Sequence, residues 1–360
     1  MFKNIRIEGL RAIQKIELED FQQFNLLVGG NNSSKTTLLE GLFLLTGPTN
    51  AHLPLKINNF RGFKFIDENV WRLIFNNLNV NSSIKISGEL KNPDQERKLI
   101  IKPSTKSLTH EKLSKTSIDN GLIEIKDSYS ESIPKIEGLT LEYFLKKIGE
   151  QDFEKIKSNI SLKGSELEFL KPKDYKEVLQ GVFLNVNTMS RDISSRFSNI
   201  QIRKQADKII KILQRIEPDL INLILGKDGI IYCDIGLDRM LPINIMGDGI
   251  IRILAIILSI SDTQNGIIFI DEIENGLHFS SQEIMWDAVF SAAKEFNVQV
   301  FATTHSLECV MAYEKSYSQI QTKNDDIRLY RIERKKDTFK VITYKDEKLK
   351  ASLESGWEVR

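Results

Sequence analysis

Cysteine is scarce in this chain of 360 residues, which contains only Cys233 and Cys309. Two cysteines are too few for a disulfide framework, and both lie in apolar stretches that predict small buried side chains in a reduced compartment. No run reaches the roughly 18 apolar residues that a membrane helix needs, and the N-terminus lacks the apolar core of a signal peptide. The sequence therefore predicts a soluble cytoplasmic protein without a membrane partner.

An excess of charge of either sign is also missing. Fifty basic and forty-nine acidic side chains leave a formal net charge of +1, which gives no overall field to attract nucleic acid. Lysines are frequent between positions 85 and 115, but acidic residues are interspersed among them. We expect a solvated face there, and a local nucleic-acid contact stays open as the alternative. With 41% hydrophobic residues, the chain can bury one elaborate core or two to three smaller ones.

A glycine-containing loop between a strand and a helix is the first feature that predicts chemistry. Residues 24–28 are apolar, residues 29–37 read GGNNSSKTT, and residues 38–45 predict an apolar helix that ends near Gly47-Pro48. In this setting the loop N–H groups and the helix N-terminus converge on an anion. We therefore expect a phosphate-binding loop.

The loop follows the pattern G-x-x-x-x-G-K-[ST] with one departure. Gly29, Lys35 and Thr36 match, whereas Ser34 replaces the second glycine and needs a compatible backbone conformation. The residues expected to surround the phosphates are Gly29, Gly30, Asn31, Asn32, Ser33, Ser34, Lys35, Thr36 and Thr37.

Two later strands end in polar residues. The apolar run 267–270 leads directly into Asp271 and Glu272, and the strand 298–302 leads into Thr303-Thr304-His305. Ligands of open α/β sheets bind at the carboxyl ends of the strands. We expect the two carboxylates to meet a phosphate-bound metal there, and His305 to reach a γ-phosphate.

A second glycine-containing helix entry lies at Gly247-Asp248-Gly249, before the apolar helix 250–258. Its free N–H groups and positive dipole end would suit an anion. Taken alone, the segment is better explained as a glycine-rich helix entry capped by Asp248.

The other segments predict an ordered series of elements. Alternation predicts strands at 2–8, 13–18, 84–90, 98–101 and 122–125, the last three in an antiparallel meander within a strand-like region from about 57 to 130. Residues 136–180 are highly charged with apolar residues at helical spacing, which predicts a helical insertion that packs on a second subunit or covers the core. Further predictions are a strand at 182–187, a helix at 200–217, a short hairpin strand at 229–237, a helix at 280–296 and an antiparallel pair at 327–333 and 338–344.

Together, the four motifs in this order resemble the ABC-type ATPase heads of the SMC, Rad50 and RecF proteins. Within that group the chain resembles the overcoming-lysogenization-defect-like AAA ATPases of the AAA15 and AAA21 families. The resemblance implies an α/β P-loop NTPase fold of the ABC-ATPase head type, with a mixed sheet, an antiparallel meander and a helical insertion. Its parts would be 1–135 with the phosphate loop and meander, the insertion 136–180 as a possible dimerisation element, 181–345 with the other motifs, and a tail 346–360.

The resemblance also implies roles in ATP hydrolysis. Lys35 would hold the β- and γ-phosphates, while Thr36 and Asp271 would bind Mg²⁺. Glu272 would orient and deprotonate the attacking water, and His305 would sense the γ-phosphate.

Other implied roles concern a second subunit. Gly247, Asp248 and Gly249 are similar to the signature loop, which reaches the nucleotide of a partner, although Gly247 replaces its first serine. Residues 275–278 would form the dimer-contacting D-loop. Asn187, at the end of the strand 182–187, is a candidate for the Q-loop metal ligand, with a structural asparagine as the alternative.

The sequence thus predicts an Mg²⁺-dependent ATPase that dimerises around two ATP molecules, with higher oligomers open. ATP binding and hydrolysis would act as a conformational switch for a separate effector such as a nuclease, in defence against phage or plasmids. The alternative is a weakly hydrolysing or non-hydrolysing DNA clamp of the recombination-mediator type, which Ser34 and the lysine-rich meander would favour.

Overall fold

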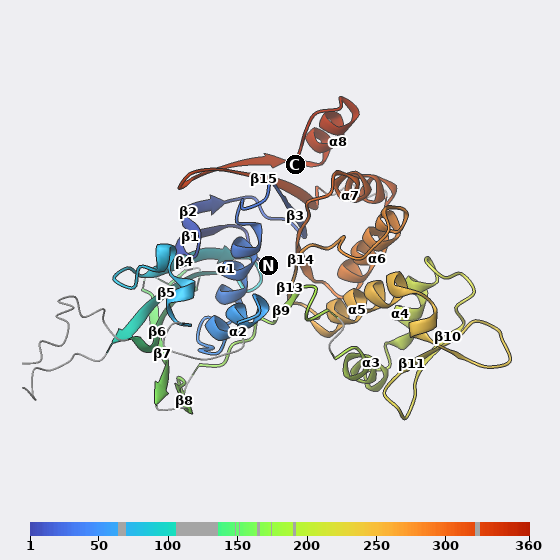
Figure 1. The fold of residues 1–360 in the computed structure, drawn as a ribbon, viewed down its shortest axis with the longest axis horizontal. Helices are drawn as coiled ribbons and strands as arrows, with labels where there is room; N and C mark the ends of the chain where they lie inside the picture. Colours follow the sequence, from blue (N-terminus) through green and yellow to red (C-terminus); the bar gives the residue numbers. More distant parts are fainter. Residues whose placement is uncertain are drawn as a thin grey trace, which may run out of the picture.

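Two β-sheets face each other across one helix, and a second group of helices covers the outer face of one sheet (Figure 1). The computed structural model describes residues 1–63, 70–105, 136–147, 149–150, 152–163, 166–173, 175–189, 192–320 and 325–360. The predicted strand at 122–125 and part of the lysine-rich stretch lie outside these residues.

The six-stranded sheet carries the predicted motifs. Its order is β16 (Thr338–Tyr344), β15 (Ile327–Lys335), β3 (Phe24–Val28), β14 (Gln299–Thr303), β13 (Ile267–Ile270) and β9 (Gly181–Leu184). All its strands except β16 run parallel. Every residue of β3, β13 and β14 is buried, as expected of parallel strands covered on both faces.

Alternate side chains of these strands enter two different cores. Ile268 and Ile270 pack among helices on one face, whereas Phe269 packs on the other, its ring 6.0 Å from that of Phe43. The helices of the first face are α3 (Ile193–Ile202), α4 (Ala206–Leu213), α5 (Asp248–Asp262), α6 (Gln282–Glu295) and α7 (Leu307–Gln319).

The opposite face holds α1 (Lys35–Thr46), which lies between the two sheets. Nearly all of its residues are buried, which explains why its apolar residues are not confined to one stripe. Helix α2 (Leu53–Phe60) packs beside it. The region from 57 onward was predicted as strand-like, and that prediction is wrong for α2 and for the short 3₁₀ turns at 72–78.

The second sheet is antiparallel and has seven strands. Its order is β2 (Ile13–Leu18), β1 (Ile5–Leu10), β4 (Ile84–Leu90), β5 (Gln95–Thr105), β6 (Ile136–Lys147), β7 (Glu154–Lys163) and β8 (Glu166–Leu170). The predicted antiparallel meander is therefore confirmed for β4 and β5.

The predicted helical insertion at 136–180 is wrong, because this segment forms β6, β7 and β8 of that sheet. From Leu139 onward the buried residues of β6 are Leu139, Leu141, Tyr143 and Leu145, at a spacing of two. The charged residues that suggested a helix lie on the solvated face. There Glu142 accepts hydrogen bonds from Lys102 at 2.7 Å and Lys155 at 3.1 Å on the neighbouring strands.

Three further boundaries differ from the prediction. The helix expected at 200–217 is divided into α3 and α4, and Lys204, with a φ of 57°, lies between them. The segment after it forms a small sheet of β10 (Asn222–Leu225), β11 (Ile231–Asp234) and β12 (Leu241–Pro242). The tail forms α8 (Asp346–Glu354), and both Leu349 and Val359 are fully buried in the helix-side core.

None of the helices in the described ranges is both long enough and apolar enough to cross a membrane.

Candidate functional site

The carboxyl ends of β3, β13 and β14 meet at one edge of the six-stranded sheet, because these strands are parallel neighbours. Asp271, directly after β13, accepts hydrogen bonds at the same oxygen, Oδ1, from Thr36 at 3.0 Å and from Thr303 at 2.7 Å. Burial raises the pKa of Asp271, and the two hydroxyl donors oppose that rise. Three segments distant in sequence thus converge on one carboxylate.

Lys35 lies at the centre of the phosphate loop and is only 4% exposed. Its Nζ donates to the carbonyl oxygens of Gly29 at 2.8 Å and Gly30 at 3.2 Å, and lies 3.4 Å from Nδ1 of His305. Burial lowers the pKa of Lys35 to about 8, although the negative charge of Asp271 acts to raise it. A buried ammonium next to carbonyl oxygens is suited to exchange them for phosphate oxygens.

The loop conformation explains how Ser34 replaces a glycine. Ser34 has a φ of 69° and a ψ of 23° and precedes the first residue of α1, a left-handed conformation that favours glycine. Its buried hydroxyl has no hydrogen-bond partner among the described residues. Gly29 is required sterically, because a Cβ there would lie 2.3 Å from the carbonyl oxygen of Ile332. The Ser34 hydroxyl without a partner and the glycine-containing loop backbone both fit a bound phosphate.

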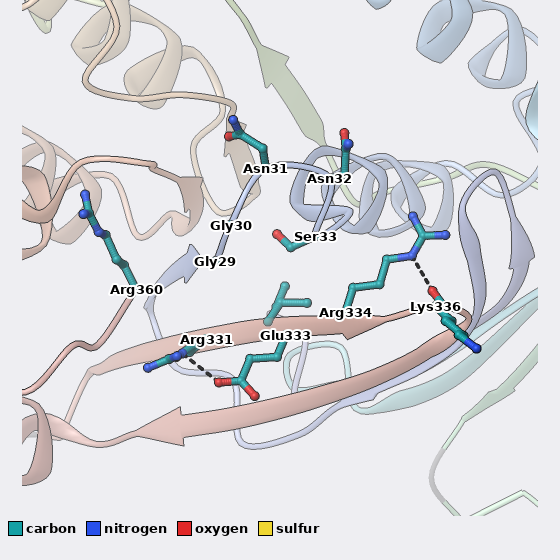
Figure 2. A pocket seen from close by; sticks show the side chains of 11 residues that line it. Gly29, Gly30, Asn31, Asn32, Ser33, Arg331, Glu333, Arg334, Lys336 and Arg360 are labelled. Carbon is teal, nitrogen blue, oxygen red and sulfur yellow. Dashed lines mark hydrogen bonds and ion pairs between the residues drawn. The ribbon is translucent and has the colours of Figure 1, made fainter.

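Two hollows border the loop. The smaller, of about 260 Å³, is lined by Ala12, Arg61, His305, Arg334 and the loop residues 32–37. The larger, of about 520 Å³, lies between the other face of the loop and β15 (Figure 2). Its cationic side chains are Arg331, Arg334, Lys336 and Arg360. Arg334 borders both hollows, so this side of the loop also presents positive charge to an anion.

Glu272 and His305 are held by backbone contacts. Glu272 has a φ of 51°, and its N–H donates to Oγ1 of Thr303 at 2.8 Å. Its carboxylate accepts from Nδ2 of Asn275 at 3.2 Å. The N–H of His305 donates to Glu274 at 2.8 Å. The Asp271 carboxylate accepts from Thr36 and Thr303, whereas that of Glu272 accepts from Asn275, so the two carboxylates have different partners.

A buried ion triad lies behind the loop and was not predicted. Glu40 in α1 is fully buried and pairs with Arg11 and with Arg61, each at 2.8 Å. Arg61 also donates to Thr37 at 3.2 Å. Glu40 is the one carboxylate in an otherwise apolar helix, and a buried carboxylate demands cationic partners, so this signal was present in the sequence. Thr303 was also missed as a supporting residue.

The second glycine segment lies at another part of the same edge. Gly247 has a φ of 104° and precedes α5. A Cβ at Gly249 would lie 3.7 Å from Leu277, and one at Gly276 would lie 2.9 Å from Arg252 in α5. The α5 N-terminus and the predicted D-loop at 275–278 therefore form one continuous surface.

The prediction for Asn187 stays untested. This residue is exposed in the turn after β9, and its N–H donates to the side chain of Asn185 at 3.0 Å. Asn185 is the buried asparagine of this turn, and it also donates to the carbonyl oxygen of Phe60 at 3.1 Å.

A bound Mg²⁺ would be compatible with this edge. The part of the chain that the structure describes contains no group of three His, Cys, Asp or Glu residues suited to a metal. Magnesium is commonly held by one or two protein oxygens together with phosphate oxygens. Thr36 and Asp271, 3.0 Å apart, offer such a pair.

Comparisons with known proteins agree with this geometry. A family model described as "AAA domain, putative AbiEii toxin, Type IV TA system" matches residues 24–311. The chain is 24% identical over 331 residues to a Helicobacter pylori protein named ATP/GTP phosphatase, covering 86% of each. It is 45% identical over 65 residues to the uncharacterized protein MJECL11 of Methanocaldococcus jannaschii, covering 18% of this chain and 57% of that one.

Solved structures with similar folds include two SMC heads. One, bound to the C-winged helix domain of ScpA, has 13% identity and a TM-score of 0.49, with 96% of this chain and 99% of that one covered. The other, from Thermotoga maritima, has 10% identity and a TM-score of 0.47, with 95% and 98% covered.

The family match extends from the start of β3 into α7, and so includes the phosphate loop near its first residue and His305 near its last. The fold places a phosphate loop between β3 and α1 and an antiparallel sheet over that helix, as expected of a P-loop ATPase. The chain belongs to the AAA-domain ATPase family whose model carries the AbiEii description.

Proposed function

We propose that this protein is an Mg²⁺-dependent ATP hydrolase in which two copies close around two ATP molecules. As an AAA-family ATPase it hydrolyses the nucleotide at the edge described above. One observation carries the proposal: Thr36 and Thr303 meet on Asp271, while Lys35 lies within 3.4 Å of His305.

The residues of the loop bind and neutralise the phosphates. Lys35 in its protonated form contributes charge, and Gly29 to Thr37 contribute backbone N–H groups. Thr36 and Asp271 would hold Mg²⁺, which would offset the negative charge of the bound phosphates. Thr303 fixes the orientation of Asp271 through its 2.7 Å hydrogen bond.

Hydrolysis then depends on positioning and on one proton acceptor. Glu272 accepts the proton of the attacking water, and its carboxylate is oriented by Asn275. Nδ1 of His305 faces the ammonium of Lys35 at 3.4 Å, so that nitrogen accepts and Nε2 carries the proton. His305 can therefore donate from Nε2 toward a γ-phosphate.

A partner subunit completes each site. The α5 N-terminus at Gly247-Asp248-Gly249 provides N–H groups and a positive dipole end. Gly247 and Gly276 are both exposed, and this accessibility supports their use in trans. Hydrolysis is then conditional on closure of the dimer, which makes the ATPase a switch.

The switch acts on a separate effector, and a nuclease is one effector whose action such closure could control. The family description, which names a putative toxin of a Type IV TA system, supports a place in defence against phage or plasmids. We place the protein in the cytoplasm, where ATP and Mg²⁺ are available.

A mixing experiment tests the shared site. Lys35→Ala removes the phosphate lysine, and Gly249→Asp places a negative charge at the α5 N-terminus, where a Cβ makes only an ordinary contact. Each variant should be inactive alone. Because a mixed dimer contains one intact site, an equal mixture should recover about a quarter of wild-type turnover. A mixture no more active than its components, although it forms mixed dimers, would contradict the sharing of sites but not ATP hydrolysis itself.

A further inference from the structure

A groove lies on the helical side of the molecule, and none of its lining residues borders the two hollows at the phosphate loop. It has a volume of about 450 Å³ and is formed by α6, α7, α8 and the 3₁₀ turn 279–281; α8 packs against α7 at this end of the molecule (Figure 1). Phe279 is 66% exposed and Met311 53% exposed, whereas Ala312 is only 5% exposed. Two large apolar side chains thus stand over a floor that continues into the core.

The rim of this groove is acidic. Its charged residues are four glutamates and one lysine, namely Glu283, Glu308, Glu314, Glu354 and Lys315. Lys315 already pairs with Glu283 at 2.7 Å, so the remaining charge is negative. The whole chain is nearly neutral at +1, which means that this acidity is local. An apolar centre with an acidic rim is complementary to a segment that is apolar on one face and basic on the other.

Both walls of the groove begin at the candidate nucleotide site. Phe279 follows directly after the segment from Asp271 to His278. Helix α7, which carries Met311, begins after His305 with Ser306 as its N-cap. A shift of either segment on nucleotide binding would therefore move a wall of the groove.

We propose that this groove is the docking site for a basic amphipathic helix of a partner protein. Apolar side chains of that helix contact Phe279 and Met311, while its lysines and arginines pair with Glu308, Glu314 and Glu354. This partner is the effector of the function proposed above, and to that extent the inference rests on it. The binding surface itself depends only on the apolar and acidic side chains.

The test uses two synthetic 18-residue helices, one built of leucine and lysine on opposite faces and one of leucine and glutamate. Fluorescence anisotropy should detect binding of the basic helix and not of the acidic helix. Met311→Ser and Glu354→Lys should each weaken the basic helix at least about tenfold. Glu166→Lys, on exposed strand β8 outside the groove, is the matched control and should leave its affinity unchanged.

Several results would overturn the proposal. They are equal binding of both helices, failure of the basic helix to bind, and equal loss in the Glu166→Lys control. Sedimentation distinguishes a second copy of the chain as the occupant: if Glu354→Lys prevents dimerisation, the groove is a self-interface and the inference is wrong. ATP turnover of Met311→Ser should remain at the wild-type level. Measuring this turnover distinguishes a failure of the groove proposal from a failure of the ATPase proposal.

Discussion

Replacing Ser34 by glycine should stabilise the protein, because glycine adopts the left-handed conformation of this position at lower cost. Ser34 is held at a φ of 69° and its buried hydroxyl has no partner among the described residues. A non-glycine residue in the left-handed region costs about 1–2 kcal/mol. The greater freedom of glycine in the unfolded chain offsets about 0.5–1 kcal/mol of the gain.

The hydroxyl adds a second contribution. A buried donor without a partner costs about 1–3 kcal/mol, so together with the backbone contribution the free energy of unfolding should rise by about 1–4.5 kcal/mol in Ser34→Gly. The unfolding entropy is about 2.1 cal/mol/K per residue, and for this chain a gain of that size raises Tm by about 1–6 °C. Thermal unfolding without nucleotide measures this directly.

The neighbouring Asn32 supplies the control. It has a φ of 63° but an exposed side chain, and asparagine tolerates this conformation better than serine. Asn32→Gly should therefore leave Tm unchanged or lower it slightly. The reasoning is refuted if Ser34→Gly lowers Tm, or if the two variants shift it equally.

Thr303→Val removes both hydroxyl contacts to the Asp271 turn with little change in shape, and should lower kcat about 10- to 100-fold while thermal unfolding shows an intact fold. Lys35 has its pKa lowered to about 8, so affinity for a non-hydrolysable ATP analogue, followed by calorimetry, should fall up to about tenfold per pH unit above pH 8. Stability should change in the opposite sense: between pH 8 and the ordinary lysine value of 10.5 the unfolded chain binds more protons, so the Lys35 contribution to stability grows with pH. Glu40→Ala leaves Arg11 buried without its carboxylate, and denaturant titration should show a loss of about 3–5 kcal/mol.

The central strands could be predicted because their burial on both faces leaves a continuous apolar run. This holds for β3, β13 and β14, which differ from prediction by one residue or less at either end. Strand β6 was misassigned because Phe144 on its solvated face interrupts the alternation. Lys98 and Lys155 of the neighbouring strands cover that ring, at 6.0 and 5.3 Å from its centroid, and such cover depends on the tertiary fold.

The site was predictable wherever a polar residue directly follows an apolar strand. Lys35, Asp271 and His305 lie together at one sheet edge, and their proposed roles stay predictions. The triad of Glu40 with Arg11 and Arg61 could not be paired in advance, because its members come from three different segments that only the fold brings within 2.8 Å.

The central claim is that Glu272 activates water at a site that binds ATP through other residues. The direct measurement is the steady-state ATP turnover of Glu272→Gln beside its affinity for ATP. The account predicts that turnover falls at least about a hundredfold while the ATP affinity remains within a few-fold of wild type. Turnover close to the wild-type rate in this variant would contradict it.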